Sequence, residues 1–214
     1  MYLSKVHLNV LNARHLKVLS DCYQMHRLVS CACGSGSHGS RVLFRPELPD
    51  GPFVSLLVQS EKEPDWDRPR EKLNMDVQAE CKPYALPSFG KGQRLRFRLR
   101  ANPIKTIRGG RENETDSTGD LKRIRIPILN DNLQDQWLER KLQQGGARLD
   151  GALAQKEGEV TGNRRNGQAP ITLYAVRFDG QLTVQDPYRF ASAIRSGVGP
   201  AKGFGFGLLS ISPL

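Results

Sequence analysis

Two side chains near the N-terminus are spaced so that they could move protons together. Tyr23 and His26 stand three positions apart in residues 20–31, which have the pattern of a short helix. Positions i and i+3 of a helix share a face, so the phenol and the imidazole would point at the same place, with Arg27 as a cation beside them. Histidine is a natural proton donor or acceptor near neutral pH. A lone histidine on a short helix is also commonly a structural side chain, so the residues alone leave both interpretations open.

A second candidate is a segment with arginine at every other position. In residues 93–101 (QRLRFRLRA) arginine alternates with apolar residues, which places the two kinds of side chain on opposite faces of a strand. Guanidinium groups on alternate residues lie about 6.6–6.8 Å apart, near the spacing of nucleic acid phosphates. The alternative is an edge strand whose outward charges prevent aggregation.

A partner for this strand is predicted further along the chain. Residues 122–129 (KRIRIPIL) alternate in the same manner, and we expect them to complete a basic hairpin with residues 93–101. Neutralising several phosphates would make binding strongly dependent on salt. The predicted nucleic acid contacts of this hairpin are Arg94, Arg96, Arg98, Arg100, Lys105, Lys122, Arg123 and Arg125.

The third candidate is a glycine-rich segment near the C-terminus, residues 197–207 (GVGPAKGFGFG). It is neither a dinucleotide fingerprint, because Lys202 stands where a third glycine would be needed, nor a P-loop, because Gly203 follows the lysine in place of Ser or Thr. Unhindered backbone N–H groups around Lys202, Gly203 and Gly205 could approach a polyanion closely. A tight connection from a helix to a strand would use the same glycines.

The distribution of charge favours a polyanionic partner. The chain carries 32 Lys and Arg against 22 Asp and Glu, a formal net charge of +10. Residues 1–45 hold six basic residues and one acid, residues 91–111 eight and none, and residues 187–214 three and none. Residues 46–90 are the acidic part, with five basic residues and nine acids. A basic surface that serves only solubility predicts scattered charge, and this clustering argues against it.

Composition excludes several classes of protein. With 214 residues, 38% hydrophobic and 25% charged residues, the chain is expected to form a globular protein of one sizeable domain or two small ones. Its longest apolar runs fall short of the about 18 residues that cross a bilayer. Lys5 and His7 interrupt the position where a secretory signal would be apolar, so we expect a cytoplasmic protein.

The four cysteines are expected to be reduced thiols. Cys22, Cys31, Cys33 and Cys81 are ordinary in number for this length, and nothing indicates export. A zinc site would favour C-x-x-C pairs, whereas the chain has one C-x-C. We expect no metal and no cofactor.

The periodic segments occur in a repeated order. Each half of the chain reads β-α-β-β-α-β, which is the ferredoxin-like pattern, so we predict an α+β fold of two tandem ferredoxin-like domains. Turn residues near Pro87 to Gly90 suggest the boundary, with residues 1–87 as the N-terminal domain and residues 88–214 as the C-terminal domain. The predicted helices are 20–31, part of 64–78, 131–143 and 187–197, and the predicted strands are 2–10, 41–45, 52–59, 80–86, 93–101, 122–129, 147–155, 171–184 with a turn at Asp179-Gly180, and 204–211.

Together these segments resemble a known family. The runs 21–26 (DCYQMH), 97–105 (FRLRANPIK) and 199–213 (GPAKGFGFGLLSISP), with the Trp137-Leu138 helix, resemble the CasE family of precursor-crRNA endoribonucleases from type I-E CRISPR systems. The spacing of Gly197, Gly199, Gly205 and Gly207 also matches that family's glycine-rich motif, and the resemblance spans the whole chain.

The resemblance implies a double ferredoxin-like fold and metal-independent cleavage at the base of the repeat hairpin in precursor crRNA. It implies that Tyr23 and His26 are the catalytic pair, and that the protein is a subunit of the Cascade complex beside its backbone subunit at the 3′ hairpin. The 2′-OH would attack the adjacent phosphorus and leave a 2′,3′-cyclic phosphate and a 5′-OH. Arg27, Lys202 and Arg164 are the candidates for offsetting charge on the phosphorane.

Two alternatives stay open. One is a non-catalytic scaffold with the same fold that binds structured RNA, in which His26 is structural. The other is a zinc-containing nucleic acid-binding module built on Cys22, Cys31, Cys33 and His38.

Overall fold

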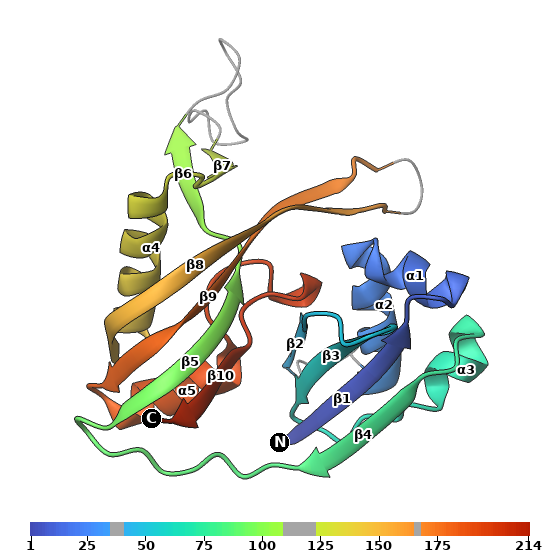
Figure 1. The fold of residues 1–214 in the computed structure, drawn as a ribbon, viewed down its shortest axis with the longest axis horizontal. Helices are drawn as coiled ribbons and strands as arrows, with labels where there is room; N and C mark the ends of the chain where they lie inside the picture. The colour runs from blue at the N-terminus through green and yellow to red at the C-terminus, as the bar shows by residue number, and fades with distance from the viewer. Residues whose placement is uncertain (35–40, 109–122, 165–167) are drawn as a thin grey trace.

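The computed structural model describes residues 1–34, 41–108, 123–164 and 168–214, without the side chains of Arg108 and Arg123. Two four-stranded antiparallel sheets dominate it, with strand orders β2-β3-β1-β4 and β10-β5-β9-β8 (Figure 1). The first sheet consists of β1 (Tyr2–Asn9), β2 (Val42–Pro46), β3 (Phe53–Ser60) and β4 (Gln78–Pro83). The second consists of β5 (Arg94–Ala101), β8 (Ala147–Gly162), β9 (Ile171–Val184) and β10 (Leu209–Pro213).

The helices complete the same arrangement twice. In each sheet the first and third strands of the unit lie in the centre, the second and fourth at the edges, and a helical crossover precedes each edge strand. This is the order of the ferredoxin-like unit, so the predicted α+β class and tandem ferredoxin-like fold are confirmed. The helices are α1 (Ala13–Leu19), α2 (Cys22–Cys33), α3 (Arg68–Leu73), α4 (Asp131–Gln144), α5 (Pro187–Ser196) and the 3-10 turn η1 (Lys202–Phe204).

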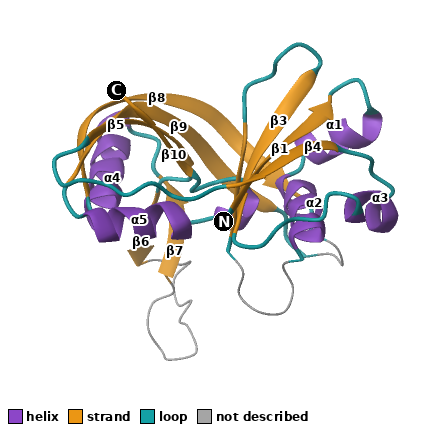
Figure 2. Cartoon of the chain, turned by 90° about the horizontal axis from the view of Figure 1, so that it is seen from below, coloured by secondary structure: helices purple, strands orange, loops and turns teal. Residues whose placement is uncertain are grey.

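Alternation along β5 builds the core of the second half. Leu95, Phe97 and Leu99 are at most 4% exposed and pack in one cluster with Trp137 of α4 and Phe190 of α5. Both helices lie on one side of this sheet (Figure 2), so the arginines of β5 are on the opposite side. The apolar face of α2 fills the corresponding core of the first half.

The predicted pairing of the basic strands is wrong. Residues 123–127 form β7 (Arg123–Pro127), which pairs with β6 (Ile104–Arg108) and not with β5. Both edges of β5 are already hydrogen-bonded, to β9 and to β10. The chain leaves β5 at Asn102 and Pro103, where Pro has no N–H to continue a ladder, so a separate two-stranded hairpin begins at Ile104.

The predicted turn at Asp179-Gly180 is also wrong, because both residues lie inside the continuous strand β9. Asp179 pairs with Arg98 and Gly180 with Phe97 across the β5–β9 ladder. A Cβ at Gly180 would collide with the backbone carbonyl of Gly151, next to a register shift in β8. The glycine therefore serves a close approach between strands and not a reversal of the chain.

Other differences are smaller. The short helix α1 was not predicted, β8 continues to Gly162 beyond the predicted end, and residues 64–78 form only a one-and-a-half-turn helix. The segment between β4 and β5 contains the proposed boundary between residues 1–87 and 88–214. Among the described residues, none of the helices is long and apolar enough to cross a membrane.

Candidate active site

The start of α2 is fixed by its N-cap. Asp21 Oδ1 accepts hydrogen bonds from the backbone N–H groups of Tyr23 and Gln24 at 2.8 and 3.1 Å. Asp21 Oδ2 accepts another from the Asn163 backbone N–H at 3.1 Å. A Cβ at Gly162 would lie 2.9 Å from the Tyr23 nitrogen, so the outer end of β8 rests directly against the first turn of α2. The second half of the chain thereby positions the helix of the first.

The structure brings Tyr23 and His26 together as predicted. Both side chains are half-buried on one face of α2, and their ring centroids are 6.3 Å apart. The ring of Phe204 also lies beside the imidazole, with centroids 5.5 Å apart. Phe204 belongs to η1, so the glycine-rich segment forms one wall of this site.

The tautomer of His26 follows from its hydrogen bond. Nδ1 lies 2.9 Å from the backbone carbonyl oxygen of Gly203, and a carbonyl can only accept, so Nδ1 carries the hydrogen. The Ser30 hydroxyl is 3.5 Å from the same nitrogen. Nε2 of the neutral ring is then the proton acceptor, and the protonated ring can donate from the same atom. The imidazole is therefore oriented for general acid or base work.

The glycine-rich segment acts both as a connection and as a wall of the site. The C-cap of α5 is Gly197 with φ +78°, and the chain turns through Ala201 at +60° and Gly205 at +87° before β10. These left-handed conformations bring Gly203 under the imidazole. The interpretation as a tight helix-to-strand connection and the interpretation as a backbone surface near the substrate are thus compatible.

Two of the predicted cations come from the elements that form this site, Lys202 from η1 and Arg27 from α2. Lys202 is half-buried, and burial, followed by the charges of Arg41 and Lys141, lowers the pKa of its ammonium group. Arg27 lies on α2 and donates a hydrogen bond to the Gln24 side chain at 3.0 Å. Gly205 presents its carbonyl to Arg100 at 3.2 Å, so its backbone faces inward.

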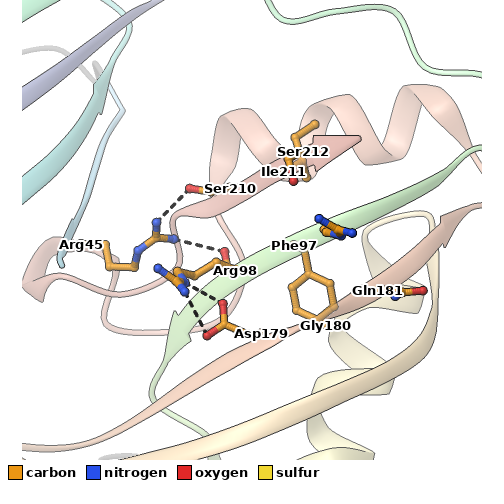
Figure 3. Close-up of a pocket in the computed structure, with 10 residues that line it drawn as sticks. Arg45, Phe97, Arg98, Asp179, Gly180, Gln181, Ser210, Ile211 and Ser212 are labelled. Carbon is orange, nitrogen blue, oxygen red and sulfur yellow. Dashed lines mark hydrogen bonds and ion pairs between the residues drawn. The ribbon is translucent and has the colours of Figure 1, made fainter. Parts of the chain in front are cut away.

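Acids elsewhere in the chain offset the predicted arginine face of β5 at two of its four positions. Arg98 binds Asp179 at 2.6 Å (Figure 3) and approaches Glu47 at 3.5 Å. Arg100 is 5% exposed and binds Glu157 at 2.5 Å. These acids come from β8, β9 and the segment after β2, so the local absence of acids in residues 91–111 did not reveal them. Arg98 and Arg100 hold the structure together.

The other two arginines of the row remain at the surface. Arg96 is exposed and lines a cleft between the two sheets. Arg94 is exposed and donates to Gln181 at 3.1 Å, with Asp150 at 3.8 Å.

The remaining predicted contacts lie at or near the β6–β7 hairpin. Lys105 and Arg125 are exposed on its two strands. Arg125 and Arg164 both line a cavity that also borders Phe204, so they converge near the site from different elements. Lys122 and the side chain of Arg123 lie outside the described residues.

The cysteines are all free thiols. Burial raises the pKa of Cys22 to about 11 and that of Cys33 to about 12, which leaves both protonated at neutral pH. Within the described ranges, no group of three or more His, Cys, Asp and Glu side chains is placed to hold a metal ion. His38, part of the zinc alternative, lies outside them.

The sequence did not indicate which groups orient the imidazole of His26. The Gly203 carbonyl acts through the backbone, so its residue type carries no signal for this role. Phe204 could have been suspected as the aromatic residue beside Lys202 and Gly203. Arg100 and Gly205 connect this loop to the second sheet, and Arg100 also stacks 4.5 Å from the ring centre of Phe206.

Comparisons with known proteins agree with this architecture. A family model described as "CRISPR associated protein" matches residues 1–213. The CRISPR-associated endoribonuclease Cse3 of Thermus thermophilus is 36% identical over 233 aligned positions, covering 100% of both chains. The CRISPR system Cascade subunit CasE of Escherichia coli is 38% identical over 125 positions, 58% of this chain and 60% of that protein.

A solved structure of a relative carries RNA. Thermus thermophilus Cse3 bound to an RNA that represents a pre-cleavage complex has a TM-score of 0.77 to this chain at 35% identity. The match covers 99% of this chain and 98% of that one.

Proposed function

This chain belongs to the CRISPR-associated protein family, and on that premise we propose that it is an endoribonuclease that cuts the repeat hairpins of precursor crRNA. Two relatives, one named as a CRISPR-associated endoribonuclease and one as a Cascade subunit, support both the activity and the partner. The chain would remain on the crRNA hairpin after the cut and act as a Cascade subunit in antiviral defence, in the cytoplasm.

The single observation that carries the site is the imidazole of His26, held through Nδ1 by the Gly203 carbonyl at 2.9 Å with Tyr23 on the same helix face. We assign catalysis to these two side chains. The ribose 2′-oxygen attacks the adjacent phosphorus, and the bond from phosphorus to the 5′-oxygen breaks. One proton leaves the 2′-hydroxyl and one reaches the departing 5′-oxygen, and His26 Nε2 carries one of these transfers. The products are a 2′,3′-cyclic phosphate and a 5′-hydroxyl.

The charge of the phosphorane needs nearby cations. Arg27, Lys202 and Arg164 are the candidates, and Lys105, Arg125, Arg94 and Arg96 would contact the stem backbone. No water or metal ion enters either bond change of this proposal, so cleavage should persist in excess chelator.

The test uses repeat hairpin RNA with and without a 2′-deoxy sugar at the cut. We expect the deoxy RNA to bind and to stay intact, because it lacks the nucleophile. Cleavage of the deoxy RNA would exclude the proposed chemistry.

A second test compares substitutions at two histidines, His26 and His7. His26→Ala should slow single-turnover cleavage about 10²–10⁴-fold with hairpin affinity retained, since general acid–base catalysis contributes that much. His7 is a matched control, because it lies on β1 and contacts Ser55 at 3.2 Å. Unchanged cleavage by His26→Ala would reject this site, and hairpin binding without any cleavage by the wild type would favour the non-catalytic scaffold.

A further inference from the structure

A cavity of about 570 Å³ lies beside the proposed active site. It is bounded by the start of β6 and the end of β7, by the outer ends of β8 and β9, and by the glycine-rich segment. A volume of this size is within the range of small-molecule sites, about 300–1,000 Å³.

The interior of this cavity is mostly apolar and includes two aromatic rings. Ile104, Leu173 and Pro200 contribute aliphatic wall, and Tyr174 and Phe204 contribute the rings. Flat apolar surfaces with an aromatic ring are what an unstacked nucleobase binds, and every base has a face that can stack.

The polar lining of this cavity consists of two arginines, the exposed Glu159, Thr172 and a buried amide. Arg125 and Arg164 are exposed and line it from β7 and from the residues just after β8. Guanidinium groups there suit the phosphates of a strand whose base points inward. Asn102 is 5% exposed and contributes an amide to the lining, while its Oδ1 accepts a hydrogen bond from the Tyr174 backbone N–H at 3.3 Å.

One side chain separates this cavity from the imidazole. Phe204 lines the cavity, and its ring centroid is 5.5 Å from that of His26. When the sugar or phosphate of a nucleotide contacts His26, its base therefore lies within the width of the Phe204 ring from this apolar cavity.

We propose that this cavity receives the unstacked base of a nucleotide adjoining the scissile phosphodiester, with Phe204 and Tyr174 as its aromatic surfaces. This rests on the proposed ribonuclease function and adds a position where the RNA sequence is read. The deep major groove of an A-form stem hides its base edges, so a base drawn out at the end of the stem is the one that protein side chains can contact.

The first experiment removes the base. Two hairpin RNAs each carry an abasic site, one on the 5′ side and one on the 3′ side of the cut. We expect one of the two to be cleaved at least tenfold more slowly than the intact RNA under single-turnover conditions. Intact-RNA rates for both abasic RNAs would overturn the proposal.

The second experiment fills the cavity. Thr172 is exposed on β9 and lines it, so Thr172→Trp should occupy the space without entering the core. Leu153→Trp is the control, since Leu153 is 81% exposed on β8 and is not part of the lining. We expect Thr172→Trp to cut intact RNA at least tenfold more slowly, and to cut the responsive abasic RNA at the wild-type rate for that RNA. An equal loss on both RNAs, or no loss on intact RNA, would overturn the assignment.

The third experiment separates this inference from the catalytic one. A 2′-deoxy hairpin that cannot be cut carries 2-aminopurine at each flanking position in turn, and its fluorescence is followed on binding. We expect one position to respond with wild type, His26→Ala and Leu153→Trp but not with Thr172→Trp. A response without any cleavage of natural RNA would refute the proposed function while supporting the cavity. Absence of a response at both positions would refute the cavity.

Discussion

The two rings of the candidate site differ in how they are held. His26 is oriented by a backbone carbonyl at 2.9 Å, whereas Tyr23 is placed by its position one turn earlier on α2, 6.3 Å away between ring centroids. Orientation by Gly203 makes the imidazole a positioned acid or base in either protonation state. The phenol would have a separate task, to hold the ribose or to share the proton transfer.

Removing only the Tyr23 hydroxyl tests that task. Tyr23→Phe keeps the ring beside His26, and we expect single-turnover cleavage to slow about 10²-fold with unchanged hairpin affinity. Tyr188→Phe is the control, because Tyr188 is 90% exposed on α5. Wild-type cleavage by Tyr23→Phe would show that the ring and not the hydroxyl is used.

Arg100 illustrates a residue whose ion-pair partner the sequence pattern did not reveal. Its side chain is 6% exposed and binds Glu157, so Arg100→Met leaves a partly buried carboxylate with fewer partners. We expect the free energy of unfolding to fall by about 3 kcal/mol, measured by urea denaturation. Arg96→Met on the same face of β5 should change it by less than about 0.5 kcal/mol, since Arg96 is exposed. Equal losses for the two variants would contradict this distinction.

The sequence did not reveal these ion pairs because the paired residues are far apart along the chain. Alternation correctly predicted that these arginines share a face, because side-chain direction is a local property of a strand. Their partners are 81 positions away for Arg98 with Asp179, and 57 positions away for Arg100 with Glu157. Such pairs form only once strand order is known, so a local count of charges could not show them.

At the scale of elements, the backbone of the glycine-rich segment sets the position of the Gly203 carbonyl. Gly205 has φ +87°, and a Cβ there would lie 3.2 Å from Phe44 Cε2 and 3.4 Å from Arg100 Nη1. A side chain at this position would therefore be strained both by its backbone conformation and by its neighbours.

Gly92 provides a matched control for that strain. It has φ +83°, but a Cβ there would meet no atom within 4 Å. We expect Gly205→Ala and Gly92→Ala each to lower stability by about 1 kcal/mol or more. Only Gly205→Ala should slow cleavage at least tenfold, because it displaces the loop under His26. Cleavage equal in the two variants would mean that the loop does not orient the imidazole.

Element types were more predictable than element pairing. The N-caps Asp21 and Asp186, the stop at Gly197 and the alternation in β5 all have local signals, and the corresponding helices and strand are present. Strand partners have no such signal, which is why β7 was paired with β5 in place of β6. Asp179-Gly180 has the composition of a hairpin turn, yet its residues serve an ion pair and a close strand approach.

Across the whole molecule, the candidate site is assembled from both halves of the chain. His26 comes from the first half, whereas Gly203 and the Gly162 contact come from the second. The contacts between the halves are therefore part of the site. Gln59 of β3 donates to the Ile194 carbonyl of α5 at 3.1 Å, which is one such contact.

Arg45 is a side chain that connects the two halves through several hydrogen bonds. It lies on β2, is 3% exposed, and donates to the carbonyls of Arg98 and Leu208 at 3.1 and 3.2 Å. It also donates to the Ser210 hydroxyl at 3.1 Å and to Glu47 at 2.6 Å (Figure 3 shows Arg45 beside Ser210). Four acceptors thus depend on one buried guanidinium, three of them in or next to strands of the second sheet and one just after β2.

The two tryptophans allow the coupling between the halves to be measured. Trp66 packs against the first core and Trp137 is buried in the second. In Trp66→Phe and Trp137→Phe backgrounds, the remaining fluorescence reports one half at a time, and we expect coincident urea transitions.

Adding Arg45→Met should lower the free energy of unfolding by about 3 kcal/mol and separate the two transitions, because unpaired buried acceptors remain at the junction. The same change should slow cleavage, since it loosens Gly203 relative to His26. Arg94→Met, at an exposed arginine of β5, should leave the transitions coincident, and coincident transitions in Arg45→Met would mean that other contacts couple the halves.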